Sequence, residues 1–372
     1  YWSGEDNILF LIGPRTDKDN WLKFSYDEPI HLVPEPDGLR IFSAAQCEFL
    51  QRVPNVVESV LKMGSTSPGA MLLAAWEWFQ KKSAKADDTL RHDIKVELAQ
   101  AVDHCIEAAA HEFDPSMQRK LLKAASYGKA FIDEYNSEFF VEICRTLRVL
   151  NGVRYFEIGI PLTYTQYKLM GTTLLIDRLL ARHHHLLAYK ICDYLHLPSD
   201  RVLIHWAIAK VHASTNDELT AKEIVKKLKS HAGISFAEIA SAAHRKNKTT
   251  LATMLLDYEP RPADQVPLLL SMRQYEAALL KSLQSGDTDL VHLVLVQLRS
   301  QLAASELIHL IGKYDTALAL YIKSCKDHDK ERDKLRELYT MQQRPDLLAG
   351  LLVREAYQHP VCIRHPLHIY DR

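Results

Sequence analysis

Residues 287–298 read DTDLVHLVLVQL, and this stretch decides the fold class. From Leu290 to Leu298 the apolar residues occupy almost every side of a helix, which is typical of a helix packed between neighbouring helices. Asp287 or Thr288 can cap the free amides of its first turn. The sequence therefore predicts a buried helix here, with Leu293 in the core.

The sequence around this helix also has a helical pattern. No proline occurs between Leu268 and Arg344, and proline breaks helix interiors. Two further sets of apolar residues have the spacing i, i+3, i+4, i+7, which places each set on one helix face. They are Ala188, Ile191, Cys192 and Leu195, and Tyr314, Ala317, Leu318 and Tyr321. From about Ala44 onward the sequence therefore predicts helices.

A weak repeat links three of the predicted helices. Tyr275-Glu-Ala-Ala-Leu279 resembles Tyr314-Asp-Thr-Ala-Leu318, 39 residues later, and the same step backward reaches Phe236. A period near 40 is typical of one helix pair in an α-solenoid. A compact helical bundle is the alternative, but single cores stop growing beyond roughly 250–300 residues. We therefore predict a mainly α fold, an α-solenoid of stacked helical hairpins.

The first 43 residues have a different pattern. Six of the 15 prolines lie before residue 69, and short apolar or alternating runs between them predict strands. A few strands cannot bury a core alone. Because the chain opens on Tyr1 rather than Met, we expect these strands to end a larger β-domain. The predicted segments are strands over 1–43, the solenoid over 44–357 and an irregular tail over 358–372.

Composition excludes several function classes. There are 46 Lys and Arg against 47 Asp and Glu, and this balance argues against a dedicated nucleic-acid binder. No apolar run approaches the roughly 20 residues that span a bilayer. The six cysteines lie far apart, which is typical of thiols in a reducing compartment. They are Cys47, Cys105, Cys144, Cys192, Cys325 and Cys362.

Motifs for catalysis are absent or incomplete. Gly128-Lys129 and Gly312-Lys313 lack the other residues of a phosphate-binding loop, so we interpret both as turn or helix-end residues. Neither a Gly-x-Ser-x-Gly elbow nor a His-Glu-x-x-His motif occurs. We therefore assign no catalytic and no cofactor-binding residue, and we expect no enzymatic activity.

Two histidine-rich groups could be taken for metal ligands. His183 to His185 are adjacent, and consecutive helix residues diverge by about 100°, so we interpret them as a surface turn. Near the end, Cys362, His365 and His368 are residue types that zinc prefers, but two prolines interrupt the segment. We assign no metal site, and metal binding by the tail stays open.

Lysines gather on one predicted helix. Lys222, Lys226 and Lys229 share a helix face, which could meet phosphates or anionic lipid. More basic residues follow at 245–248. A solvated helix face is the plainer interpretation, and an adaptor for a membrane surface or nucleic acid is the alternative.

Five strings are more specific than helical periodicity: YDEPIHLVPEPDGLRIFS from Tyr26, LLKAASYGKAF from Leu121, IGIPLTYTQY from Ile158, YEPRPADQVPLLLSM from Tyr258 and QSGDTDLVHLVL from Gln284. Together they resemble the family of vacuolar protein sorting-associated protein 16, core subunits of the HOPS and CORVET tethering complexes. The likeness runs in order from about Trp21 to about Tyr357. Beyond it the chain departs from the family pattern.

The resemblance implies a β-propeller followed by a long α-solenoid, with residues 1–43 as the last propeller strands. It implies a scaffold on the cytosolic face of late endosomes and lysosomes or the vacuole, which supports vesicle-mediated transport and SNARE-dependent fusion of endosomes, lysosomes and autophagosomes.

The implied partners are an SM-family subunit and other class C subunits, with indirect association with membranes and SNAREs. No cofactor, nucleic acid or small-molecule substrate is implied. The SM-subunit contact lies in the C-terminal solenoid of the family, where this chain departs from it, so no contact residue is assigned. A coat subunit similar to clathrin heavy chain is the alternative.

Overall fold

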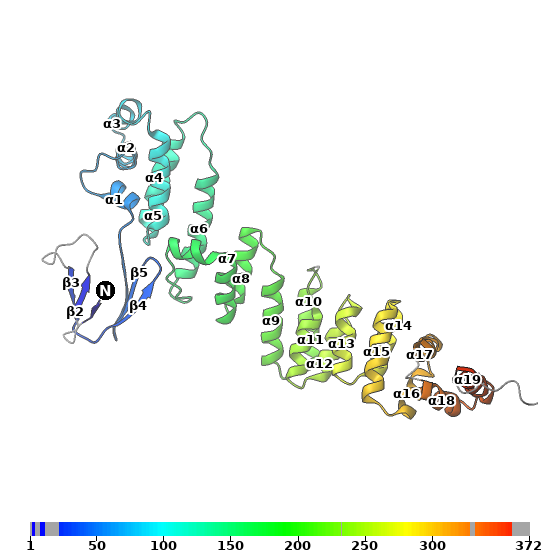
Figure 1. Ribbon diagram of the computed structural model, residues 1–372. Coiled ribbons are helices and arrows are strands. Elements are labelled where there is room, and N and C mark those ends of the chain that lie inside the picture. The colour runs from blue at the N-terminus through cyan, green and yellow to red at the C-terminus, as the bar shows by residue number, and fades with distance from the viewer. Residues whose placement is uncertain (1, 4–7, 12–21, 232, 328–331, 359–372) are drawn as a thin grey trace, which may run out of the picture. The chain divides into compact units, whose positions relative to one another are not determined.

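The computed structural model (Figure 1) divides into two compact units, residues 1–197 and 198–372. The strands precede the helices and most described residues are helical, which confirms the predicted fold class. The structure describes residues 2–3, 8–11, 22–231, 233–327 and 332–358.

The described strands form two antiparallel three-stranded sheets, each in sequence order. In the second sheet Glu35 pairs with Gly38, so a two-residue turn joins its first two strands. The first sheet contains β1 (Trp2–Ser3), β2 (Ile8–Leu11) and β3 (Leu22–Ser25), and the second contains β4 (His31–Glu35), β5 (Gly38–Phe42) and β6 (Cys47–Gln51).

Strand β6 corrects the predicted change to helices at Ala44. Residues Cys47–Gln51 pair with the whole of β5, after a turn in which the Ser43 amide donates to the Gln46 carbonyl (3.0 Å). The first described helix begins only at Asn55. The open edge of β5 offers a full ladder of hydrogen bonds, and such pairing overrides weak local preferences.

Strand β5 is covered on both faces. Leu39 and Ile41 point to one side and pack with Leu9 of β2, which joins the two sheets. Arg40 points to the other side and is also buried. The alternation of side chains along the strand thus places an apolar pair toward the sheets and a guanidinium toward the helices.

Helix α4 is the centre of the first unit. Its sides contact α1, α2, α5, α6 and α7, and the Cys105 thiol at its middle is fully buried. Burial raises the pKa of this thiol to about 12. The helices are α1 (Asn55–Leu61), α2 (Pro68–Gln80), α3 (Lys85–Asp88), α4 (Leu98–His111), α5 (Pro115–Lys129), α6 (Glu138–Arg154), α7 (Tyr164–Ala181) and α8 (His185–Leu195), with a short π-helix over Thr89–Asp93.

Helix α7 is broken at Gly171. This residue has φ 76° and ψ 164°, a combination that glycine adopts at little cost. Two helical segments therefore meet at an angle, and Leu169 and Leu174 on either side of the break are exposed.

The second unit is a stack of short helices in two layers. The odd-numbered helices from α9 to α17 contact one another in series, while α10 contacts α12 and α16 contacts α18. Helix α9 also packs against α10, α11 against α12, α13 against α14 and α18 against α19, so each of these pairs is a hairpin. The helices are α9 (Asp200–Ala213), α10 (Asp217–Leu228), α11 (Phe236–Arg245), α12 (Thr249–Leu256), α13 (Pro262–Ser271), α14 (Tyr275–Ser285), α15 (Thr288–Gln301), α16 (Ala304–Ile311), α17 (Asp315–Asp327), α18 (Arg332–Met341) and α19 (Pro345–Gln358).

One tight turn recurs at the ends of helices. It occurs after α2, α7, α8, α11, α13 and α18, and in each case one non-glycine residue has a left-handed φ of 52–61°. The next amide donates to the carbonyl five residues earlier, as from Lys248 to Ala243 (3.0 Å), which satisfies the helix end. The left-handed residues are Lys82, His183, His196, Asn247, Arg273 and Gln343.

The 39-residue repeat marks helix starts, but not helix pairs. Phe236, Tyr275 and Asp315 begin α11, α14 and α17, and two other helices lie between each start and the next. Helices in the same layer, such as α11, α13, α15 and α17, instead begin 26 or 27 residues apart. The predicted pair of about 40 residues was therefore wrong, because these helices are short and their turns are tight.

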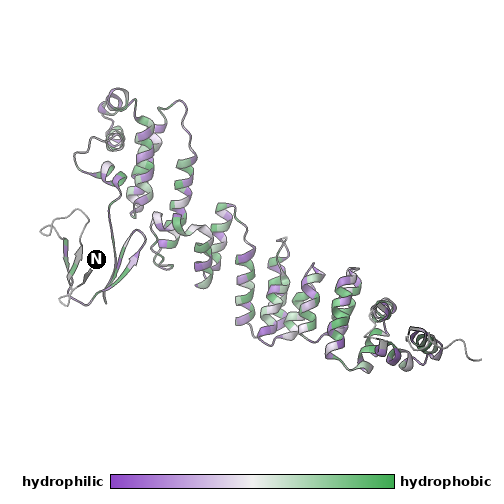
Figure 2. Cartoon of the chain, viewed as in Figure 1, coloured by the Kyte–Doolittle hydropathy of each residue, from purple (hydrophilic) through white to green (hydrophobic). Residues whose placement is uncertain are grey.

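The prediction that Leu293 lies in the core was also wrong. Its side chain is 44% exposed, whereas Val294 and Leu295 are buried. Helix α15 has one side open to solvent because a two-layer stack encloses only part of each helix. Figure 2 shows that the helices of this unit contain both apolar and polar residues. The predicted cap is confirmed, since the Asp287 carboxylate accepts from the Asp289 amide (2.9 Å).

None of the described helices is both long enough and apolar enough to cross a membrane.

Candidate interaction surfaces

A hairpin–helix junction holds β4 and β5 against the start of α7. Asp37, in the turn of the hairpin, accepts hydrogen bonds from Thr163 Oγ1 (2.5 Å) and Gln166 Nε2 (2.8 Å). Glu35 also accepts from Gln166. Arg40 donates to Glu35 (2.5 and 3.0 Å) and to the carbonyl of Pro161 (3.3 Å). Residues more than 120 positions apart thus share one network.

Local structure prepares both sides of this junction. Thr163 and Gln166 form a capping box at the N-terminus of α7. This local interaction orients both side chains independently of the hairpin. On the hairpin, the hydrogen bonds and charge of Arg40 lower the pKa of Glu35, although burial opposes this shift. The carboxylate is therefore ionised at neutral pH and accepts hydrogen bonds from both sides.

Arg154 fixes the connection between α6 and α7. Its Nε donates to the Leu162 carbonyl (2.8 Å), and its Nη1 donates to the Glu112 carbonyl (3.3 Å). The guanidinium lies 4.0 Å from the centroid of the Phe113 ring. Burial lowers the pKa of Arg154 to about 10, so the group stays charged at neutral pH.

We expect Asp37→Ala to weaken this junction. The substitution removes the acceptor of Thr163, Gln166 and Gln51, and each lost hydrogen bond costs about 0.5–1.5 kcal/mol. Because the groups are partly solvated, we expect a total loss of about 1–2 kcal/mol. Urea-induced unfolding followed by circular dichroism measures the change. Asp27→Ala, at an exposed position, is the control, and equal losses for both variants would contradict the junction.

His111 lies at the same junction. Its ring is 5.3 Å from the Tyr164 ring in an edge-on arrangement. Burial lowers the pKa of His111, and Lys168 adds to this effect, while Glu107 and Asp37 oppose it. The folded protein therefore prefers the neutral imidazole.

The lowered pKa of His111 predicts a loss of stability in mild acid. Below the unfolded value of about 6.5 the unfolded chain binds the proton more readily than the folded chain, so folding becomes less favourable as pH falls. His111→Gln should show a smaller fall in unfolding free energy between pH 7.5 and pH 5.5 (roughly one unit either side of 6.5) than the unsubstituted chain. Urea titrations at both pH values test this, and an equal or larger fall would refute it.

A cleft of about 780 Å³ opens beside the junction. Phe42 of β5 and Leu169 and Leu174 of α7 contribute exposed apolar surface to it, and Arg178 lies at its margin. Exposed apolar groups in a cleft are typical of protein-interaction sites.

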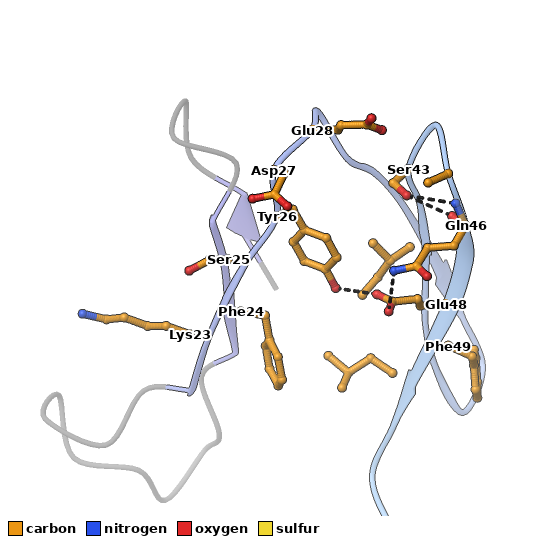
Figure 3. A pocket seen from close by; sticks show the side chains of 13 residues that line it. Lys23, Phe24, Ser25, Tyr26, Asp27, Glu28, Ser43, Gln46, Glu48 and Phe49 are labelled. Carbon is orange, nitrogen blue, oxygen red and sulfur yellow. Dashed lines mark hydrogen bonds between the residues drawn. The ribbon is translucent and has the colours of Figure 1, made fainter.

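A second hollow of about 710 Å³ lies between the two sheets. Figure 3 shows Tyr26 reaching across it to Glu48 of β6, and the hydroxyl donates to that carboxylate (2.9 Å). Burial and the hydrogen bond to Glu48 raise the pKa of Tyr26 to about 12. The phenol therefore remains a donor at physiological pH. Its hydrogen bond links the end of β3 in the first sheet to β6 in the second sheet.

Of the three lysines of the predicted helix face, Lys222 and Lys226 lie in α10 and Lys229 is its C-cap. Lys222, Lys226 and Lys229 are exposed, which confirms the shared face. Lys248 has another role: its Nζ donates to the carbonyls of Val211 (2.9 Å) and Ser214 (2.6 Å) and so caps the end of α9. Lys248 therefore does not extend the lysine face.

Other sequence candidates have structural positions. Lys129 ends α5 and Gly312 follows the end of α16, as predicted. His183 lies in an exposed turn, as predicted, but His184 is the N-cap of α8 and His185 its first residue, and both are half-buried. Cys105, Cys192 and Cys325 are buried, and Cys47 is exposed. The tail candidates Cys362, His365 and His368 lie outside the described residues.

Sequence reasoning missed the junction itself. The two sequence segments that contain it begin at Tyr26 and at Ile158 and lie far apart in the chain. Neither segment contains a pattern that predicts contact with the other. The Thr163-x-x-Gln166 capping pattern was a readable signal for the start of α7. A buried Glu259 was also missed. Its carboxylate accepts from the Ala237 amide (2.8 Å) and caps α11.

Two family models match the chain: the Vps16 N-terminal region over residues 3–142 and the Vps16 C-terminal region over residues 234–365. The chain is 44% identical to a vacuolar protein sorting-associated protein 16 homolog of Dictyostelium discoideum, over 100% of this chain and 44% of that protein. It is 43% identical to Protein VACUOLELESS1 of Arabidopsis thaliana, over 99% of this chain and 42% of that protein.

A third relative extends the comparison to a fungus. The probable vacuolar protein sorting-associated protein 16 homolog of Schizosaccharomyces pombe is 34% identical over 95% of this chain and 43% of its own length. The chain thus spans less than half the length of each of these relatives. Family models for both regions match in order, and the relatives align over nearly the whole chain. The C-terminal model reaches residue 365, so the expected departure from the family directly after Tyr357 was wrong. The chain belongs to the Vps16 family.

Proposed function

We propose that the chain is part of a non-enzymatic scaffold subunit of an endolysosomal tethering complex, HOPS or CORVET. In this role it supports vesicle-mediated transport to the lysosome or vacuole and SNARE-dependent fusion of endosomes, lysosomes and autophagosomes. Membership of the Vps16 family carries the proposal. The names of the relatives refer to vacuolar protein sorting, and that process is the one we propose for this chain.

The fold suits such a role for a physical reason. A two-layer stack of helices exposes part of every helix, so one chain can offer separate surfaces to several partners. We propose an SM-family subunit and other class C subunits as partners, on the cytosolic face of late endosomes and lysosomes or the vacuole. We further propose that the strands through Gln51 end a β-propeller, which the N-terminal region of the family would contain.

Isolation of the full-length tagged protein in mild salt tests this function. We expect an SM-family subunit and other class C subunits to be recovered in constant proportion, because a scaffold binds its partners stably. Their repeated absence would refute the proposal. A coat subunit similar to clathrin heavy chain would instead assemble with itself into cages, which light scattering of the purified protein detects.

A further inference from the structure

The solvent side of α10 carries lysines without counter-ions. Lys222, Lys226 and Lys229 lie opposite the buried Ile224 and Leu228. Within the described part of the chain, none of the three ammonium groups has an ion pair or a side-chain hydrogen bond. The charges therefore stabilise no contact in the fold.

Most acidic residues of α10 are already engaged. Asp217 accepts from Thr250 (3.0 Å), and Glu223 pairs with Lys210 (2.9 Å). Glu218 is exposed in the first turn, at the opposite end of the helix from the last two lysines. The C-terminal half of α10 consequently presents uncompensated positive charge to solvent.

Apolar groups accompany these lysines. Leu219 lies on the same face and is 59% exposed. Lys227, the next lysine on the helix, has its Nζ 4.3 Å from the centroid of the Trp206 ring of α9. An exposed leucine beside lysines, with a tryptophan at the edge, is typical of surfaces that rest on lipid headgroups.

We propose that this face of α10 binds the surface of a membrane that contains anionic phospholipid. The three ammonium groups contact lipid phosphates and carboxylates, and Leu219 enters the headgroup region. Nucleic acid would leave the exposed Leu219 without an apolar environment, whereas the headgroup region of a membrane provides one. The proposal does not rest on the proposed function, since it concerns a direct lipid contact.

Vesicle flotation with the purified chain tests this contact. The probes are vesicles of phosphatidylcholine alone and vesicles in which about a third of the lipid is phosphatidylserine. We expect binding to the anionic vesicles only, and weaker binding as salt rises. Each lysine near such a surface changes the partition coefficient roughly fivefold, so the triple variant K222Q/K226Q/K229Q should lose roughly a hundredfold.

Matched variants separate position from total charge. K226Q/K229Q should lose much of the binding, whereas K281Q/K313Q, with the same charge change at lysines paired with Asp257 and Glu276, should not. K226R/K229R should retain binding because the charge remains. Lys222, Lys226, Lys229 and Lys313 are exposed and Lys281 is half-buried, so circular dichroism should show unchanged folding.

Three results would overturn the proposal. One is equal binding of the unsubstituted chain to neutral and anionic vesicles. Another is equal binding of the triple variant and the unsubstituted chain. The third is the finding that a DNA duplex binds through the same lysines and displaces the vesicles. That result would show that the face binds nucleic acid.

Discussion

Leu295→Ala should lower the free energy of unfolding of the second unit by about 2–5 kcal/mol. Leu295 is 2% exposed and lies on the side of α15 that faces neighbouring helices. Truncation removes buried methyl groups and leaves a cavity that packed helices fill only in part. Urea-induced unfolding followed by circular dichroism measures the loss.

Leu293→Ala is the matched control for this prediction. It makes the same chemical change two residues earlier in the same helix, but at a side chain that is 44% exposed. We expect a loss below about 1 kcal/mol, because little additional apolar surface meets water. A larger loss at Leu293 than at Leu295 would show that α15 turns its Leu293 side, rather than its Leu295 side, toward the neighbouring helices.

Gly128→Ala should destabilise the first unit although alanine favours helices. A Cβ at this position would lie 2.8 and 2.9 Å from the methyl carbons of Leu72 and 2.9 Å from a methyl carbon of Val102. Both neighbours are fully buried and have little room to move. Such overpacking costs about 1–3 kcal/mol, more than the roughly 0.5–1 kcal/mol that alanine contributes inside a helix.

Gly152→Ala should have the opposite effect. Gly152 lies in α6, and the nearest atom to an added Cβ, a methyl carbon of Leu187, is 4.0 Å away. Without a clash, alanine should stabilise the chain by about 0.5–1 kcal/mol. Thermal unfolding of both variants measures whether each substitution raises or lowers the stability. Stabilisation by Gly128→Ala would refute the close packing of α5 against α2 and α4.

The sequence predicts where helices form better than it predicts which side of each helix is buried. In 290–298 almost every residue is apolar, so periodicity has no polar side from which to orient the helix. Leu293 was placed in the core for this reason, and the solvent side became visible only with the neighbouring helices. Where polar residues alternate with apolar ones, as in α8, the predicted stripe is confirmed for Ala188, Ile191 and Cys192, which are buried, while Leu195 at the helix end is half-buried.

Long-range contacts set the other limit of prediction. Glu35 and Asp37 meet Gln166 about 130 residues later, and one sequence alone holds no record of that pairing. Strand β6 was missed for a related reason, since its partner β5 rather than its own residues determines it. The capping box of Thr163 and Gln166 is local, and such patterns remain readable.

We propose that this chain works by binding other proteins rather than by chemistry. Cross-linking of the intact isolated complex, followed by mass spectrometry, tests it most directly. We predict cross-links from lysines of this chain to an SM-family or other class C subunit, on both residues 1–197 and residues 198–372. Cross-links confined to the chain itself, in a complex that contains those subunits, would contradict the claim.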